Sequence, residues 1–349
     1  GEINANTVTE VAWTFRKAPK FFDVQTVSHA NGTANTIDLF VLGTVGTVIA
    51  KNTTAAQDWC VWHRSLTAGN NLKLNLTDAQ STTNAYLSVS GTTATLSASA
   101  PTGTYVIYSW AHDTASTGLI QCGSIAGTGG RQEINLGFEP QFLLYKLASS
   151  TSDWAIMDNT RGVLRAFNND DQRLYLAPNT TMAEGSYGAP FNPYLTSTGF
   201  GSDNFGNGNT VIYMAIRRPN KPPTSGTQVY NAIARTGTGA AATVTGVGFS
   251  PDLVMETPRT KSGYSVGGIF WDRLRGANNR LTASETTAEN AGATDALTGF
   301  DVMDGVKVGV DATAMINGNF GGETYINWFF RRAPGFFDVV CYTGINPTL

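Results

Sequence analysis

Two short acidic–basic motifs carry the clearest candidates for chemistry in this sequence. The first reads Asp158-x-x-Arg161-Gly, and the same spacing recurs further along the chain as Asp272-x-x-Arg275-Gly. A carboxylate and a guanidinium three residues apart form an ion pair that fixes a turn, or they hydrogen-bond the hydroxyl groups of a sugar. The sequence favours the turn-fixing role and leaves sugar binding as the alternative. The candidate binding residues are therefore Asp158, Arg161, Asp272 and Arg275.

Catalytic and metal-binding patterns are not evident. The three histidines, His29, His63 and His112, are scattered and belong to no H-E-x-x-H motif. A retaining glycosidase places two carboxylates close together on one face. The nearest pair, Glu133 and Glu139, flanks a turn signal and fits this requirement poorly. We therefore expect no enzymatic activity, no cofactor and no metal site.

Two other groups of residues have a functional and a structural interpretation. The run Asn168-Asn169-Asp170-Asp171 offers oxygen ligands for calcium, but it lacks a complete loop pattern and favours an exposed turn. Trp59, Trp154 and Trp271 recur on hydrophobic strand signals. They suit either glycan stacking or, as we favour, the anchoring of a core.

Composition narrows the class of protein. Charged residues make up 14% of the chain, the formal net charge is −3, and there are 38 glycines. This balance argues against nucleic-acid binding, which needs a clustered basic face. No apolar run is long enough to insert into a membrane. The basic pairs 16–17, 217–218 and 331–332 are expected to be solvated strand ends, and Cys60, Cys122 and Cys341 to be small buried hydrophobes.

The elements that position these residues follow from a repeat. Residues 13–24 read W-T-F-R-K-A-P-K-F-F-D-V, and residues 328–339 read W-F-F-R-R-A-P-G-F-F-D-V. In each copy an alternating strand signal runs into Ala-Pro, which stops the strand, and a new strand signal follows at once. The junction therefore joins the last strand of one unit to the first strand of the next with almost no linker.

Further landmarks divide the chain into tandem units. Each carries several short strand signals, which is typical of an antiparallel β-sandwich, and one short helix is expected within 284–297. The predicted segments are a closing strand of a preceding repeat (1–17), repeat 1 (18–112), repeat 2 (113–219), repeat 3 (220–332) and an opening strand of a further repeat (333–349). The terminal segments 1–17 and 333–344 are expected to pair with each other or to complete sheets in neighbouring chains.

These landmarks resemble a repeat found in tail fibres and other virion proteins of tailed bacteriophages. The resemblance rests on G-F-F-D-V-V-C-Y-T-G at 335–344, L-G-F-E-P at 136–140, Asp153-Trp154, and T-Y-I-N-W-F-F at 324–330. It implies an all-β chain of three jelly-roll sandwiches, similar to concanavalin A and laminin G domains. The chain departs from the pattern at Gly46, where the other repeats have proline, at His63, where Asp158 aligns, and at Glu256, where lysine is expected.

The resemblance implies a place on the virion, with synthesis in the host cytoplasm and release by lysis. We expect a tail-fibre or adhesin segment that forms a homotrimer, contacts other virion proteins, and presents loops to bacterial surface glycan. One alternative is a capsid decoration protein or tail adaptor with a purely structural role. A second alternative is a capsule depolymerase.

Overall fold

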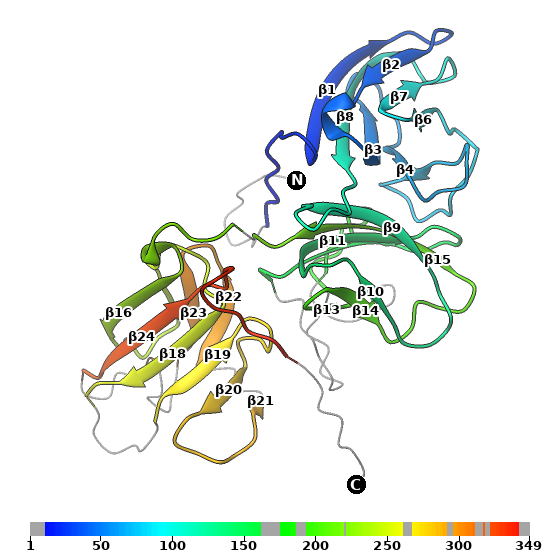
Figure 1. Ribbon diagram of the computed structural model, residues 1–349. Coiled ribbons are helices and arrows are strands. Elements are labelled where there is room, and N and C mark those ends of the chain that lie inside the picture. The colour runs from blue at the N-terminus through cyan, green and yellow to red at the C-terminus, as the bar shows by residue number, and fades with distance from the viewer. Residues whose placement is uncertain are drawn as a thin grey trace. The chain divides into compact units, whose positions relative to one another are not determined.

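The computed structural model describes residues 11–161, 175–185, 193–219, 221–260, 267–291, 296–310, 317 and 322–341 (Figure 1). The described residues form antiparallel sheets and two short 3₁₀ turns, η1 (Phe40–Leu42) and η2 (Gly226–Gln228). The predicted all-β antiparallel class is confirmed. The chain divides into two compact units: unit 1 comprises Gly1–Ser124, Ala148–Thr151 and Ile212–Met214, and unit 2 comprises Ile125–Leu147, Ser152–Val211 and Ala215–Leu349.

The strands of repeat 1 form two sheets. The larger has the order β1-β8-β3-β4-β5 and the smaller the order β2-β7-β6. Strand-preferring residues alternate along these segments, as the sequence predicts. The strands are β1 (Phe22–His29), β2 (Asn35–Asp38), β3 (Val45–Asn52), β4 (Cys60–His63), β5 (Leu72–Lys73), β6 (Leu87–Ser90), β7 (Thr93–Leu96) and β8 (Gly103–Ala111).

Repeat 2 has the same arrangement of strands. Its sheets have the orders β12-β11-β15-β9 and β10-β14-β13. The strands are β9 (Ile120–Ala126), β10 (Gln132–Asn135), β11 (Pro140–Leu147), β12 (Trp154–Asp158), β13 (Tyr194–Thr196), β14 (Gly199–Ser202) and β15 (Thr210–Arg217).

Repeat 3 shows the arrangement a third time. Its sheets have the orders β16-β24-β18-β19-β20-β21 and β17-β23-β22. In all three repeats the last strand therefore lies between the first strand and a central one. The strands are β16 (Tyr230–Thr236), β17 (Ala242–Val244), β18 (Leu253–Pro258), β19 (Ile269–Asp272), β20 (Asn279–Thr282), β21 (Asn290–Ala291), β22 (Leu297–Val302), β23 (Gly305–Val308) and β24 (Thr324–Phe330).

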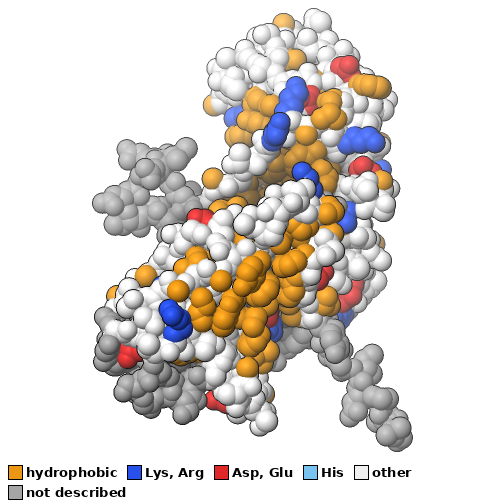
Figure 2. Space-filling view, turned by 60° about the vertical axis from the view of Figure 1, so that its left-hand side comes forward, with side chains coloured by type: hydrophobic (Ala, Val, Ile, Leu, Met, Phe, Trp, Pro, Cys, Tyr) orange, Lys and Arg blue, Asp and Glu red, His pale blue; other side chains and the backbone are white. Residues whose placement is uncertain are grey.

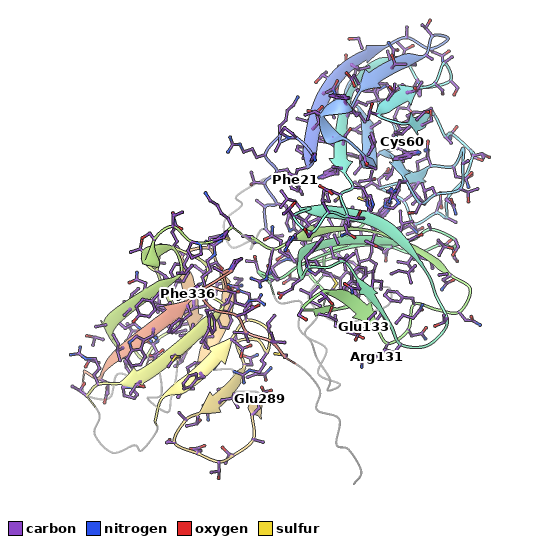
Figure 3. The ribbon with its side chains drawn as sticks, viewed as in Figure 1. Phe21, Cys60, Arg131, Glu133, Glu289 and Phe336 are labelled. Atoms are coloured by element: carbon purple, nitrogen blue, oxygen red, sulfur yellow. The ribbon has the colours of Figure 1, made fainter. Side chains whose placement is uncertain are left out.

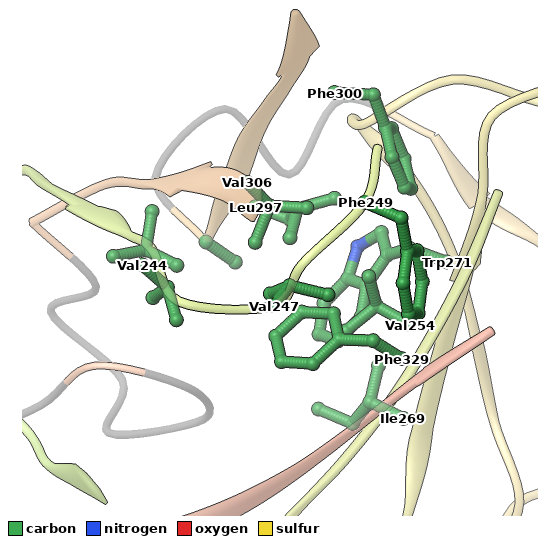
Figure 4. Packing of buried hydrophobic residues seen from close by; sticks show 12 residues of the cluster. Val244, Val247, Phe249, Val254, Ile269, Trp271, Leu297, Phe300, Val306 and Phe329 are labelled. Atoms are coloured by element: carbon green, nitrogen blue, oxygen red, sulfur yellow. The ribbon is translucent and has the colours of Figure 1, made fainter. Parts of the chain in front are cut away.

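The core of repeat 3 lies between its two sheets (Figure 4). Val254 on β18, Trp271 on β19 and Phe329 on β24 come from the larger sheet. Leu297 and Val306 come from the smaller one, and all five side chains are fully buried. Interdigitation of two inward faces is the packing expected of a β-sandwich.

Gly46 explains why repeat 1 lacks the proline that follows Glu139 in repeat 2. A Cβ added at Gly46 would stand 2.5 Å from the carbonyl oxygen of Ala111 and 2.6 Å from Sγ of Cys122. No side chain fits at such distances without displacing the backbone. This position of repeat 1 is therefore closed to any larger residue.

Two expectations about local structure are wrong. The described part of the predicted helix, residues 284–291, contains no helix, because residues 279–291 form the β20–β21 hairpin with Asn279 opposite Ala291. The strand expected at residues 10–15 is not formed over its described part. In repeats 1 and 3 the equivalent strand is flanked by two others, and residues 11–15 have no such neighbours among the described residues.

The two copies of the Ala-Pro junction adopt the same tight turn. Ala18 and Phe22 exchange backbone hydrogen bonds of 2.9 and 3.1 Å, and Ala333 and Phe337 exchange bonds of 3.0 and 3.3 Å. In the first copy β1 begins at Phe22 with no linker, as predicted. In the second copy, residues 338–341 form no strand, and residues 342–349 lie outside the described part of the chain. The pairing expected of the two terminal segments stays a prediction.

Candidate functional site

The motif at Asp158 fixes the turn that follows β12. Oδ1 of Asp158 accepts hydrogen bonds from the backbone N–H groups of Thr160 at 3.1 Å and Arg161 at 3.0 Å. Oδ2 lies 2.7 Å from Nε of Arg161. The same guanidinium also binds Glu184 and donates to the carbonyl oxygen of Ile156 at 3.3 Å. All three of its nitrogens are thus engaged within the chain.

The motif at Asp272 repeats this geometry after β19. Oδ1 of Asp272 accepts from the backbone N–H of Arg275 at 2.9 Å, and Oδ2 lies 2.5 Å from Nε of Arg275. A second carboxylate, Glu289, binds Nη1 of Arg275 at 2.9 Å. The structure brings each aspartate together with its own arginine, so the geometry favours the turn-fixing interpretation. Sugar binding at these four residues stays a prediction.

His63 takes the place of the aspartate in repeat 1. Its Nδ1 accepts a hydrogen bond from the backbone N–H of Ser65 at 3.2 Å, so the proton resides on Nε2, which lies 3.0 Å from the carbonyl oxygen of Tyr213. Burial lowers the pKa of His63 to about 4, and the hydrogen bond to Tyr213 opposes this only in part. A neutral imidazole therefore caps this turn.

An asparagine clamp, which the sequence analysis missed, holds the start of β4 in repeat 1 and of β12 in repeat 2. Oδ1 of Asn179 accepts from the backbone N–H of Trp154 at 2.9 Å, while its Nδ2 donates to Asp153 at 2.6 Å. Asn75 makes the same pair of bonds to Trp59 and Asp58, at 2.9 and 2.8 Å. The recurrence of Asp-Trp followed by a later asparagine was the available signal.

The tryptophans differ in burial. Trp154 and Trp271 are 2% and 0% exposed, so they anchor cores as predicted. Trp59 is only half-buried, and Nζ of Lys51 lies 5.6 Å from its ring centroid. Trp59, which lies just before β4, is thus not a fully buried core anchor like the other two.

The basic pairs are not simply solvated, because the second residue of each pair binds a carboxylate. Lys17 lies 2.5 Å from Asp23, and Arg218 lies 3.2 Å from Asp338. Arg332 is buried and forms a two-pronged ion pair with Glu139, with both N–O distances 2.6 Å.

Arg332 retains its charge in this buried setting. Burial by itself lowers the pKa of Arg332, but the hydrogen bonds and the charge of Glu139 outweigh it and hold that pKa above its ordinary value. Asp252 adds a further carboxylate oxygen 3.5 Å from Nε of Arg332. Within unit 2, this ion pair connects Arg332, just after β24 of repeat 3, to Glu139, just before β11 of repeat 2.

Glu133 and Glu139 bind separate partners. Glu139 is taken up by Arg332, and Glu133 binds Arg131 at 2.9 Å and accepts from the Tyr194 hydroxyl at 3.0 Å. Figure 3 shows Glu133 and Arg131 at the edge of repeat 2. No group of three or more metal-ligating side chains occurs among the described residues. The calcium candidate at 168–171 lies outside them.

All three cysteines are free thiols. Cys60 and Cys122 are buried as predicted, whereas Cys341 is only half-buried. Burial raises the pKa of Cys60 to about 11, so this thiol stays protonated at neutral pH. In the part of the chain that the structure describes, no helix has the length and apolarity needed to span a bilayer.

The comparisons with known proteins give one match. No curated protein and no solved structure matches the chain. A domain of unknown function, DUF7483, matches residues 1–219 and again residues 225–343. The break between the matches falls in the Pro-rich segment between β15 and η2, where the boundary between repeats 2 and 3 was predicted. The chain therefore belongs to the DUF7483 family.

Proposed function

We propose that this chain is a structural segment of a bacteriophage virion, in a tail fibre or adhesin that presents glycan-binding loops. The observation that carries the proposal is the buried ion pair between Glu139 and Arg332. It fixes one repeat against the next within unit 2, as a rigid array requires. The resemblance of the repeat landmarks to tail-fibre repeats supports the same function.

Such a protein works by repetition of weak contacts. A homotrimer of the chain would present each loop three times and so raise avidity without new chemistry. The turns at Asp158 and Asp272 would give those loops fixed conformations, because each is held by its own carboxylate and arginine. Loops of fixed shape lose less entropy on binding than mobile ones.

An apolar sheet face favours a second candidate function, a purely structural decoration protein or tail adaptor. Across the larger sheet of repeat 3, Trp328 pairs with Met255, Met255 with Phe270, and Phe270 with Leu281. Their neighbours Val254, Trp271 and Phe329 point into the core, so this row lies on the opposite face. Hydrophobic side chains gather over part of the surface in Figure 2. Large apolar patches mark protein interfaces.

Cryo-electron microscopy of the particle that carries the chain tests both candidates, with gold-labelled antibody to locate it. Three copies projecting from the tail are expected for a fibre or adhesin. Copies lying flat on the capsid, or packed at a tail joint with the apolar face covered, would establish the structural alternative. Absence of the chain from purified particles would refute both.

A further inference from the structure

A polar cavity of about 230 Å³ lies within unit 2 and is rich in arginine. Among the described residues, Arg218, Arg273, Arg331 and Arg332 line it, and Asp252 is the one acidic side chain that does. The cavity is close to the ion pair of Arg332 with Glu139, so its walls are held by buried contacts. Four arginines around one cavity are more than the single arginine that fixes each of the turns described above.

Three of these arginines have partners within the chain. Arg332 binds Glu139, and Arg218 lies 3.2 Å from Asp338. Arg273 donates to the carbonyl oxygens of Pro251 at 2.6 Å and Phe300 at 2.9 Å, and to the Ser250 hydroxyl at 2.6 Å, so its donors are directed into the protein.

Arg331 differs from the other three. Its backbone N–H donates to the carbonyl oxygen of Val229 at 2.8 Å, which fixes the base of the side chain. The residue is half-buried, and its guanidinium forms no ion pair with any described residue. A planar cation at a cavity wall, with no ion pair in the part of the chain that the structure describes, matches a carboxylate in geometry and charge.

The remaining polar groups indicate what carries that carboxylate. Gln141, Asn159, Thr160 and Ser250 line the same cavity and offer amide and hydroxyl groups suited to sugar hydroxyls. The Asp252 carboxylate accepts hydrogen bonds from hydroxyls, and it repels a dianion such as phosphate more strongly than a monoanion. These features favour a carboxylate on a polyhydroxylated ligand.

We propose that this cavity binds an acidic sugar and that Arg331 recognises its carboxylate. The inference rests on the proposed adhesin function and names the class of glycan, a uronic or sialic acid. Arg331 supplies the positive charge, while Gln141 and Asn159 lie where hydroxyl groups would contact the wall.

Isothermal titration calorimetry of the full chain tests the proposal with three probes: oligogalacturonate, a glucuronate oligosaccharide and a sialylated oligosaccharide. Each acidic oligosaccharide is compared with its carboxyl-reduced form, which keeps the hydroxyls and loses the charge. We expect saturable binding of at least one acidic probe and a loss of affinity of about tenfold or more in its reduced form, the effect of one charge-assisted contact.

Variants at the junction motif supply the matched control. Arg331→Ala is expected to lower affinity about tenfold, and Arg331→Lys, which keeps the charge without the fork, by less. Arg16 occupies the same motif position in the first junction and is exposed, so Arg16→Ala is expected to leave binding unchanged. Arg331→Lys serves as the test variant if Arg331→Ala fails to fold.

Equal binding of acidic and reduced forms, unchanged affinity in both Arg331 variants, or no binding of any probe would overturn the inference. The location of the chain on the particle is measured separately. A chain that projects from the tail but binds none of the acidic probes would therefore refute the acidic-sugar site and leave the proposed fibre function intact.

Discussion

Lys20 and Gly335 occupy the same position of the same turn, with φ angles of +55° and +74°. Each follows the proline of an Ala-Pro junction, and this combination is typical of a type II turn. Glycine adopts positive φ at no steric cost, whereas a lysine is strained there. The first junction thus carries a strain that the second avoids.

Replacement of Lys20 by glycine should stabilise unit 1. We expect the free energy of unfolding to rise by up to about 1 kcal/mol, because the left-handed conformation no longer costs energy. Urea denaturation measures the change. Lys20→Ala is the control, since it removes the charge and keeps a Cβ, and it should give no such gain. An equal gain in both variants would show that the lysine charge, and not the backbone, is responsible.

Removal of the Glu139 carboxylate should destabilise unit 2 strongly. Glu139→Ala leaves the buried guanidinium of Arg332 without its main partner, and we expect a loss of about 3 kcal/mol or more. Thermal and urea unfolding provide the measurement. Glu133→Ala removes an exposed ion pair and the acceptor of the Tyr194 hydroxyl in the same repeat, and it should cost about 1 kcal/mol. Similar losses in the two variants would contradict a special role for the buried pair.

The asparagine clamp should contribute to stability in both repeats that contain it. Asn179→Ala removes the acceptor for the Trp154 N–H and the donor to Asp153, and Asn75→Ala does the same in repeat 1. We expect a loss of about 2 kcal/mol for each variant by urea denaturation. Asp153→Ala removes only the acceptor of the Asn179 amide and leaves the Trp154 bond in place, so it should cost less than Asn179→Ala; an equal loss would refute the importance of the Trp154 hydrogen bond.

Acid should destabilise unit 1 through His63. The folded pKa of about 4 lies below the ordinary value of 6.5, so the unfolded chain binds more protons between these values. The stability contributed by His63 is therefore complete above about pH 6.5 and declines as the pH falls towards 4, by about 3 kcal/mol in total.

Chemical denaturation between pH 4 and pH 7 checks this pH dependence. His63→Gln keeps groups that can accept from Ser65 and donate to Tyr213 but does not titrate, so its stability should change less with pH over this range. Parallel pH profiles for the two proteins would contradict the assignment.

The class of fold could be predicted from the sequence because its signals are local. Alternating strand residues and the Ala-Pro stops lie within a few positions of one another, and the structure places β1 and β24 where those signals occur. The ion pairs at Asp158 and Asp272 were predictable for the same reason, since each partner lies three residues away.

Contacts between distant residues could not be read from local patterns. Arg332 looks like a solvated strand end, because its partner Glu139 lies 193 residues earlier in the chain. Trp59 looks like Trp154 in the sequence, yet only the folded structure shows that Trp59 is half-buried whereas Trp154 is fully buried. Gly46 appeared as a departure from the pattern, and the approach of Cys122 supplied its reason.

The pairing of first strand with last has a consequence for biosynthesis. Because β1 pairs with β8 and β16 with β24, the large sheet of a repeat cannot close until its final strand has left the ribosome. Such non-local pairing slows folding, and each repeat remains open to wrong partners until that moment. The Ala-Pro turn after β24 then separates this completed sheet from residues 338–341, which form no strand.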